Sequence, residues 1–359
     1  MSKLATSKPF RKAPLFWETR SLWALVLWPI SMIFAILSKL RYLAYELGIF
    51  KSQQLPVPII IVGNIRVGGT GKTPVVIDLA KQLSKAGYSV GIISRGYTLG
   101  AKKSNAQTQV VSAQSDPKIC GDEPVLMASA LEDLHIPVWI GQDRFNCGKA
   151  LLLANPNCQI IICDDGLQHY KLKRSPAREG GRDIEMVVRD IRGDGNGFLL
   201  PAGPLRESRE RSRDLTLDTS RSDLQQSHYL ADAPIFHINS SLGQAYNLVY
   251  PHERRHLYEF KSHSILASAG LGYPDKFFNM LSQAGLTFAR LPLPDHYDYT
   301  NNPFASPQNE SYHAILITEK DAVKCKVLND ERLWVVPLST KIPNELIDWI
   351  KAVINRPIK

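Results

Sequence analysis

The sequence predicts an α/β fold: a parallel sheet with helices on both faces, a second and smaller α/β lobe, and a hydrophobic N-terminal helix. Short apolar strands alternate with helix-length segments between residues 59 and 164, and again after residue 263. That alternation is typical of parallel sheets covered on both faces. A chain of 359 residues is also long enough to form two compact lobes.

The N-terminal hydrophobic segment is "SLWALVLWPISMIFAILS", residues 21–38, which contains no charged side chain. About 18 apolar residues is the lower limit for spanning a bilayer, and Pro29 would kink such a helix. Trp17, Trp23 and Trp28, with flanking basic residues, suit the headgroup zone. We expect a membrane anchor that spans the bilayer or lies at its surface. A cleaved signal peptide and a buried core helix are the alternatives.

The first lobe follows the anchor. Its expected elements are the strand "IIIVGN", a helix at 72–86, the strand "SVGIISRGY", a helix at 122–134, the strand "IPVWIG", a helix at 144–154 and the strand "QIIICDDG". Ligands of such sheets bind beyond the carboxyl ends of the strands. Gly63, Arg95, Gly141 and Asp164 fall at those ends.

The alternation breaks between about residues 174 and 263, where polar and charged runs favour loops or a connecting element. It then resumes with "SILASAG", a helix at 274–284, "LTFARLPL", "HAILITEKD", "LWVVPL" and a final helix from residue 344. We therefore expect an anchoring segment at 1–50, a core at 51–200, a connection at 201–262 and a C-terminal lobe at 263–359.

A phosphate-binding loop is predicted by "RVGGTGKT", which lies between an apolar strand and a helix. Such a loop points backbone N–H groups at phosphate and adds a lysine that reaches the outer phosphates. The usual pattern has glycine at the position of Arg66, and the loop is closer to the KGGxGKT variant, with Val67 where that variant has lysine. The predicted nucleotide-binding residues, which would bind ATP if the family resemblance described below holds, are Arg66, Val67, Gly68, Gly69, Thr70, Gly71, Lys72 and Thr73.

A magnesium site is predicted where "IIICDDG" ends. Asp164 and Asp165 follow four apolar residues, so a cation would offset the cost of burying two adjacent carboxylates. The hydroxyl of Thr73 is a further candidate ligand for Mg²⁺.

Charge and cysteine content restrict the surroundings. The formal charge of +9 indicates an anionic partner. The five cysteines form no CxxC pair, which is typical of reduced thiols in the cytosol and favours a catalytic body on the cytoplasmic side.

Seven motifs occur in an order that identifies a family: "GNIRVGGTGKTPVV", "SRGY", "GDEP", "DDGLQH", "GNGFLLPAGPLRE", "LPDHYDYT" and "TEKDAVK". The chain resembles the tetraacyldisaccharide 4′-kinases, the lipid A kinases of Gram-negative bacteria, from its hydrophobic helix to its last helices. The resemblance implies an inner-membrane enzyme that moves the γ-phosphoryl group of ATP to the 4′-hydroxyl of a membrane-embedded tetraacyldisaccharide 1-phosphate. Basic residues would meet the anionic membrane surface.

The resemblance also implies roles for individual residues. Asp122 and His296 would form a catalytic pair, with Asp122 nearest the acceptor, although Asp122 could equally cap the helix that follows it. Supporting or acceptor-binding roles would belong to Arg95, Arg144, Gln168, His169 and Arg206. Each arginine could instead form an ordinary surface ion pair.

Two departures from the family pattern stand out. "RSPAREGGRDIE" carries an apparent insertion at 175–182, and Arg189 occupies a position where an apolar or acidic residue is expected.

A nucleotide-dependent switch or metallochaperone is the alternative function, but it would need neither the anchor nor "LPAGPLRE". A nucleic-acid-binding ATPase would draw only on the net charge, so we expect no nucleic-acid partner.

Overall fold

The structure is a computed structural model that describes residues 14–96, 108–220 and 233–357. Its larger sheet has the strand order β3-β4-β2-β5-β1-β6-β7-β8 within those residues. Neighbouring strands are parallel except for the pair β3–β4. The strands are β1 (Ile59–Gly63), β2 (Val90–Ser94), β3 (Gln109–Val111), β4 (Val138–Ile140), β5 (Ile160–Asp164), β6 (Ile184–Arg189), β7 (Leu215–Asp218) and β8 (Ile235–His237).

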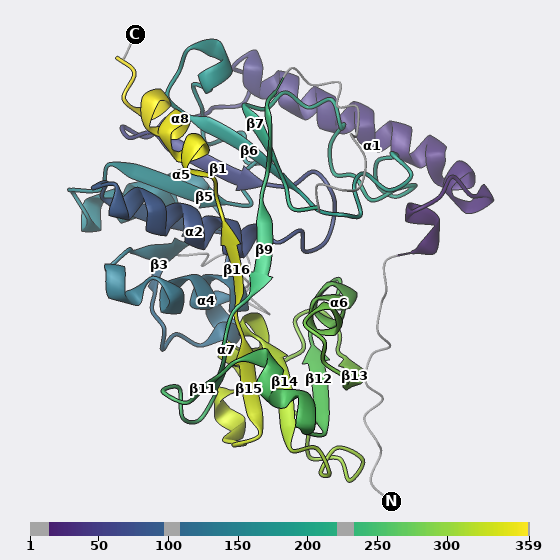
Figure 1. Cartoon of the computed structure of the whole chain (residues 1–359). Coiled ribbons are helices and arrows are strands. Elements are labelled where there is room, and N and C mark those ends of the chain that lie inside the picture. Colours follow the sequence, from purple (N-terminus) through teal and green to yellow (C-terminus); the bar gives the residue numbers. More distant parts are fainter. Residues whose placement is uncertain (1–13, 97–107, 221–232, 358–359) are drawn as a thin grey trace, which may run out of the picture.

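Helices cover both faces of this sheet (Figure 1). Successive strand residues point to opposite faces, so Ile60 and Ile162 enter one core while Ile61 and Cys163 enter the other. The first core is closed by α2 (Lys72–Lys85), α4 (Asp122–Ala130) and α8 (Asn344–Ile354), and the second by α5 (Arg144–Ala154). The short helix α3 (Pro117–Cys120) precedes α4.

The second lobe contains a smaller sheet of order β11-β10-β15-β14-β12-β13 among the residues that the structure covers. Its strands are β10 (Ala245–Asn247), β11 (Arg254–Arg255), β12 (Ile265–Ala269), β13 (Ala289–Pro292), β14 (Ala314–Thr318) and β15 (Leu333–Val336). The helices α6 (Asp275–Gln283) and α7 (Glu319–Cys325) belong to this lobe. Helix α6 buries Phe277, Phe278 and Leu281, a spacing that places all three on one helical face.

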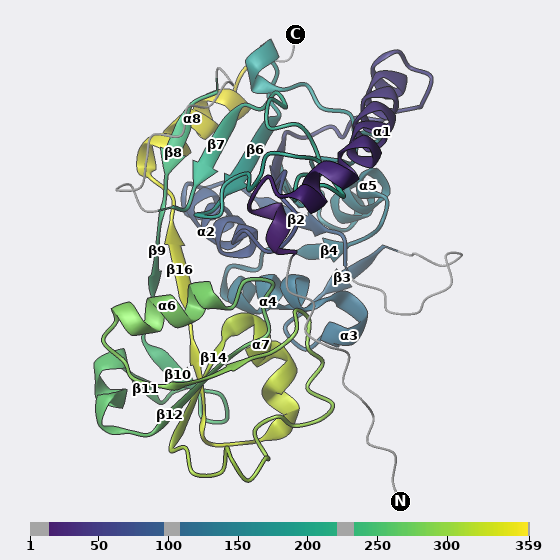
Figure 2. The ribbon, with the colours of Figure 1, turned by 90° about the vertical axis from the view of Figure 1, so that its right-hand side faces the viewer.

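A two-stranded antiparallel ribbon, β9 (Asn239–Leu242) with β16 (Leu338–Lys341), runs between the two sheets (Figures 1 and 2). After β16 the chain returns to the larger sheet, where Leu346 and Ile350 of α8 complete its first core.

The predicted fold class is confirmed, with one difference in the middle of the chain. Loops or a connecting element were expected between residues 174 and 263, but β6, β7 and β8 extend the larger sheet there. The strands β7 and β8 have only four and three residues, too few for the sequence to show a period. The expected domain boundaries stay a prediction.

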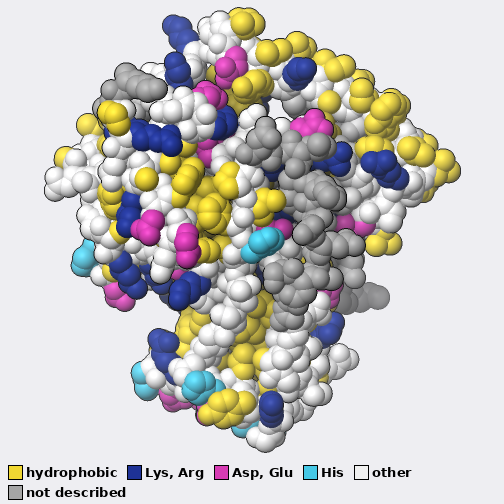
Figure 3. Space-filling view, turned by 45° about the horizontal axis from the view of Figure 1, so that its top comes forward, with side chains coloured by type: hydrophobic (Ala, Val, Ile, Leu, Met, Phe, Trp, Pro, Cys, Tyr) yellow, Lys and Arg dark blue, Asp and Glu magenta, His cyan; other side chains and the backbone are white. Residues whose placement is uncertain are grey.

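The N-terminal helix α1 (Leu22–Glu46) lies on the outside of the larger lobe (Figure 1). It is long and apolar enough to cross a membrane, and only Ala24 and Ser31 are buried. Hydrophobic side chains gather along its surface (Figure 3). The alternative of a buried core helix is therefore wrong for this segment.

Candidate active site

The glycine-rich loop connects β1 to α2 in the predicted position. Gly68 and Gly71 have φ angles of 102° and 86°, a left-handed conformation that favours glycine. Helix α2 begins at Lys72, directly after Gly71, so its free backbone N–H groups face the loop. This geometry is that of an anion-binding turn.

The loop is held in shape by Asn64. Its Nδ2 donates to the carbonyl oxygens of Arg66 at 2.5 Å and Gly68 at 3.1 Å. Its Oδ1 accepts a hydrogen bond from Lys72 Nζ at 2.9 Å. Asn64 was not among the site residues predicted from the sequence, because its only signal was its place after the strand.

Arg66, the off-pattern residue, is buried and tied to protein atoms. Its guanidinium donates to the carbonyl oxygens of Arg192 at 3.1 Å and Gly193 at 3.3 Å, and it pairs with Glu18. The next residue also bonds to a distant segment: Val67 N donates to the carbonyl of Pro204 at 2.8 Å. The side chain of Arg66 thus braces the loop from behind.

Asp165 and Lys72 form the charged centre of the site. Lys72 Nζ lies 3.3 Å from Asp165 Oδ1, and Arg206 Nη1 lies 3.1 Å from Asp165 Oδ2. Burial raises the pKa of Asp165, but Lys72 and Arg206 outweigh it and hold that pKa at about 2. The structure therefore brings together three residues that the sequence analysis placed in separate motifs.

Asp164 has the opposite electrostatic character. Its Oδ2 accepts from Ser94 Oγ at 2.9 Å, and Oδ1 is buried with no hydrogen-bond partner among the residues described. Burial, reinforced by Glu123 and Asp165 and opposed by Lys72, raises its pKa to about 7. A buried carboxylate oxygen without a partner fits a cation ligand.

Other donors near the loop fit the same cation. The hydroxyl oxygen of Thr70 is buried and has no partner in the described part of the chain, and Thr73 lies in the first turn of α2. No group of three or more His, Cys, Asp or Glu side chains is placed to hold a metal within those same residues. Such a donor set suits Mg²⁺, which takes few protein ligands and shares the phosphate oxygens of its nucleotide.

The predicted pair of Asp122 and His296 is in contact. His296 Nδ1 lies 2.9 Å from Asp122 Oδ2, although the two residues come from different lobes. Asp122 begins α4 and is buried, while His296 has a φ angle of 58° in the loop after β13. The hydrogen bond to Asp122 raises the pKa of His296.

Two lysines of α7 complete this cluster. Lys324 Nζ lies 3.2 Å from Asp122 Oδ2, and Lys320 Nζ lies 2.9 Å from Glu123 and 4.0 Å from Asp122 Oδ2. Burial raises the pKa of Asp122, but His296 and the two lysines outweigh it and lower that pKa. Neither lysine was among the site residues predicted from the sequence. The available signal was their spacing of four residues in "TEKDAVK", which places both on one face of a helix.

The lysine cluster and the phosphate loop adjoin. Burial raises the pKa of Glu123, but Lys320 and Lys72 outweigh it and lower that pKa. After burial, Glu123 is the next contribution that raises the pKa of Asp164. The amino end of α4 therefore lies between the phosphate loop and the second lobe.

The remaining predicted residues follow β2 and β5. His169 is half-buried, and burial, followed by Arg144 and Arg95, lowers its pKa to about 4. Gln168 accepts a hydrogen bond from Arg41 of α1 at 3.5 Å through its carbonyl, while its side-chain Nε2 is buried without a partner within the described chain. Arg95 is exposed.

Arg144 differs from its neighbours because it is only 2% exposed. Its Nη1 donates to the Gly141 carbonyl at 2.5 Å, and the side chain lies among Cys147 and Cys163 in the core covered by α5. The supporting or acceptor-binding role of Arg144 stays a prediction. In the structure its guanidinium donates to a carbonyl oxygen directly after β4.

The motif "GNGFLLPAGPLRE" joins the N-terminal helix to the phosphate loop. Ser31 Oγ of α1 donates to the Leu199 carbonyl at 2.6 Å, and Trp17 Nε1 donates to the Pro201 carbonyl at 3.0 Å. At the other end of the motif, Arg206 N donates to the Ile65 carbonyl at 2.7 Å. One segment thus connects α1 with the site.

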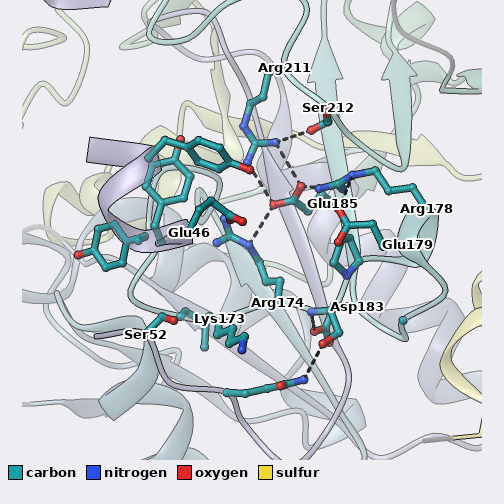
Figure 4. A pocket seen from close by; sticks show the side chains of 18 of the residues that line it. Glu46, Ser52, Lys173, Arg174, Arg178, Glu179, Asp183, Glu185, Arg211 and Ser212 are labelled. Atoms are coloured by element: carbon teal, nitrogen blue, oxygen red, sulfur yellow. Dashed lines mark hydrogen bonds and ion pairs between the residues drawn. The ribbon is translucent and has the colours of Figure 1, made fainter. Parts of the chain in front are cut away.

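A large cavity of 1120 Å³ lies away from the phosphate loop, between α1 and the chain after β5. Its charged side chains compensate one another: Glu185 is surrounded by Arg174, Arg178 and Arg211 (Figure 4). The apparent insertion at 175–182 contributes to its wall. Because these charges are paired within the protein, we assign no ligand to this cavity.

Comparisons with known proteins agree on one family. The family model described as tetraacyldisaccharide-1-P 4′-kinase (LpxK) matches residues 23–355. The chain is 46% identical over 358 residues to a tetraacyldisaccharide 4′-kinase of Polynucleobacter asymbioticus, covering 97% of both chains. It is 43% identical over 345 residues to one of Janthinobacterium sp. (strain Marseille), covering 93% of both.

A solved structure is also similar. The crystal structure of LpxK from Aquifex aeolicus in complex with ATP aligns with a TM-score of 0.73 at 29% identity, covering 92% of this chain and 99% of that one. The motifs, the site and the comparisons therefore lead to one conclusion: the chain belongs to the tetraacyldisaccharide-1-phosphate 4′-kinase family.

Proposed function

We propose that the protein transfers the γ-phosphoryl group of ATP to the 4′-hydroxyl of tetraacyldisaccharide 1-phosphate, using the site described above. The observation that carries this proposal is the contact between Asp122 and His296, which joins the two lobes beside the phosphate loop. A phosphate cradle alone would suit many nucleotide-binding proteins. An acid–histidine pair beside it supplies what transfer to a hydroxyl needs, a group that removes the proton.

The phosphate loop would hold the triphosphate of ATP, with Lys72 reaching its outer phosphates. Support comes from the left-handed glycines, from the helix that starts at Lys72 and from the ATP complex of the similar structure. Asp164 and Thr73 would hold Mg²⁺, with Asp165 assisting while it orients Lys72. The cation would neutralise charge that develops on the phosphate oxygens.

Asp122 would accept the hydroxyl proton, and His296 would orient the carboxylate and relay the proton. Asp122 is ionised because His296, Lys320 and Lys324 face it, so it is in the state that accepts a proton. Its low pKa makes it a weak base alone, whereas His296, whose pKa is raised, provides the next acceptor.

The acceptor would approach from the side of α1. Arg206 is paired with Asp165 and half-buried, and Gln168 and His169 lie on the loop that contacts α1. The exposed apolar surface of α1 would lie in the cytoplasmic leaflet of the inner membrane, with the catalytic body on the cytoplasmic side. The acyl chains could then stay in the bilayer while the sugar reaches the site.

The test is phosphorylation of purified tetraacyldisaccharide 1-phosphate by the full chain with labelled ATP, followed by chromatography of the lipid. We expect a labelled product with the wild type, and a loss of about 10²-fold or more in rate with Lys72→Ala. ATP consumption without the lipid, and no labelled lipid with it, would instead support a nucleotide-dependent switch.

A further inference from the structure

The phosphate loop of this chain has a deficit of positive charge. The loop variant that it resembles carries a lysine at the position of Val67, which supplies a second cation for the phosphates. In this chain Lys72 is the only lysine of the loop, and it is already bonded to Asn64 and Asp165. The other cation of the loop, Arg66, is bonded to two carbonyl oxygens and to Glu18. A nucleotide triphosphate carries several negative charges in a confined space, so a second cation from elsewhere is expected.

The second lobe lies directly against the loop. A Cβ placed on Gly272 would stand 3.5 Å from the backbone nitrogen of Gly69. The neighbouring Tyr273 has its ring 5.0 Å from the guanidinium of Arg192, and Arg192 Nη2 donates to the Gly69 carbonyl at 2.6 Å. The segment between β12 and α6 is therefore packed onto the phosphate loop.

Two cations stand at the two left-handed glycines of the loop. Arg192 Nη1 lies 3.5 Å from the point where a Cβ on Gly68 would stand, and Lys276 Nζ lies 3.5 Å from the corresponding point at Gly71. Arg192 is engaged, because it forms a bidentate pair with Asp190.

The side-chain ammonium of Lys276 has no hydrogen bond or ion pair with any residue in the described ranges of the chain, whereas its backbone N–H donates to the Tyr273 carbonyl at 3.4 Å. It is half-buried in the first turn of α6, and burial lowers its pKa, an effect that Asp190 opposes and Arg192 reinforces. A half-buried ammonium without a partner is costly unless an anion accompanies it in the working state.

We propose that Lys276 binds the phosphate oxygens of ATP as a second phosphate-binding lysine, contributed by the C-terminal lobe. It takes the part of the lysine that is absent at Val67 and comes from another segment of the chain, the first turn of α6. The proposal rests on ATP being the phosphoryl donor, as in the proposed function. A single ammonium suits this position because it is compact and reaches past the bare glycine at 71. Bound ATP then links the two lobes, since Lys72 and Lys276 hold the same triphosphate.

The test is calorimetric titration of the full chain with a nonhydrolysable ATP analogue and Mg²⁺, in the absence of lipid. We expect Lys276→Met to raise Kd by about 10-fold or more, because a charge-assisted hydrogen bond is lost, and Lys276→Arg to restore most of the affinity. Asn279→Met, an exposed position on the same helix, is the matched control and should bind like the wild type. The salt dependence of Kd should also fall in Lys276→Met.

Equal affinities of Lys276→Met and the wild type would overturn the proposal. Circular dichroism checks the fold of each variant, and Lys276→Gln replaces Lys276→Met if the latter does not fold. The outcome is independent of the acceptor: failure of the wild type to phosphorylate lipid would count against the proposed function, while the comparison of nucleotide affinities would still decide the role of Lys276.

Discussion

Asp122 is a buried carboxylate that stays ionised because groups from the other lobe face it. Lys324 lies at 3.2 Å and His296 at 2.9 Å from the same oxygen atom. Asp122 and His296 therefore titrate as a pair, in which the acid has a lowered pKa and the histidine a raised one. The proton that leaves the acceptor is expected to reside on the histidine of this pair.

The pH dependence of the reaction follows from that pair. Because His296 must be neutral to accept the proton, we expect kcat/KM to rise with pH. The midpoint of this rise should lie above pH 6.5, the ordinary pKa of histidine. Asp122→Asn removes the anion that raises this pKa, so the midpoint of the rise should move to lower pH. The maximal kcat/KM at high pH should fall by about 10²- to 10⁴-fold. Rates measured between pH 5 and 9 check both changes. A midpoint that stays in place in the variant would show that another group titrates.

Binding of Mg²⁺ should change the protonation of Asp164, and this change can be measured. Its pKa of about 7 means that it is partly protonated at neutral pH, and a bound cation favours the charged form. Binding of Mg²⁺ with ATP should therefore release protons at pH 6.5 and fewer at pH 8.5. Calorimetry in two buffers of different ionisation enthalpy measures this release, and Asp164→Asn should abolish it. Equal release from that variant would assign the protons elsewhere.

Helix α1 is an apolar element that the protein core does not use. Large side chains such as Trp23, Ile33 and Leu37 are more than half exposed, although isolated exposed apolar residues are common on any protein. A continuous surface of this kind marks a contact with a membrane or a partner. Ser31 of α1, together with Trp17 in the turn that precedes the helix, fixes α1 to the motif beside the site through hydrogen bonds.

Membrane attachment through α1 can be tested with one charge. Ile33→Asp should lower the affinity for vesicles that contain anionic lipid by about 10-fold or more, since a buried isoleucine contributes roughly 1.5–3 kcal/mol. Flotation of the full chain with vesicles measures the effect. Leu153→Asp is the control, because Leu153 is 73% exposed and belongs to α5 and not to α1. Equal flotation of the two variants would argue against α1 as the attachment.

In the whole molecule, the two lobes are joined by ion pairs and by the C-terminal part of the chain, which passes from the second lobe back to the first. Lys320 bridges Glu123 of the first lobe and Asp295 of the second, at 2.9 and 3.4 Å. The last strand and helix then return the chain to the core of the larger sheet. The lobes are thus connected both electrostatically and covalently around the site.

The charged contact between the lobes should also contribute to stability. Lys324 is 8% exposed at its side chain, and Lys324→Met leaves Asp122 with fewer cations in a buried site. We expect the free energy of unfolding to fall by about 1–3 kcal/mol, together with a loss of kcat. Urea unfolding measures the first and the lipid kinase assay the second. Lys351→Met, which breaks an exposed pair with Asp348, should change neither. An unchanged Lys324→Met would mean that the lobes are held together by other contacts.

Much of the fold could be predicted because its signals are local. The helix at 144–154 has the bounds that its pattern indicates, and the strand ahead of "RVGGTGKT" ends one residue before Asn64. The strands β7 and β8 were missed because three or four residues between charged runs show no period. The role expected for Arg144 stays a prediction, and its burial could not be read from the sequence because it depends on how α5 packs.

The sequence by itself determined the α/β class, the phosphate loop, the acidic strand end and the apolar helix, because each depends on residues within one short segment. Only the tertiary structure decided that α1 stays outside the core, that Arg66 braces the loop from behind, and which cations face Asp122 and Gly71. Those contacts join residues far apart in the chain. They depend on the packing of two lobes, and no local period encodes the distance between one helix and another.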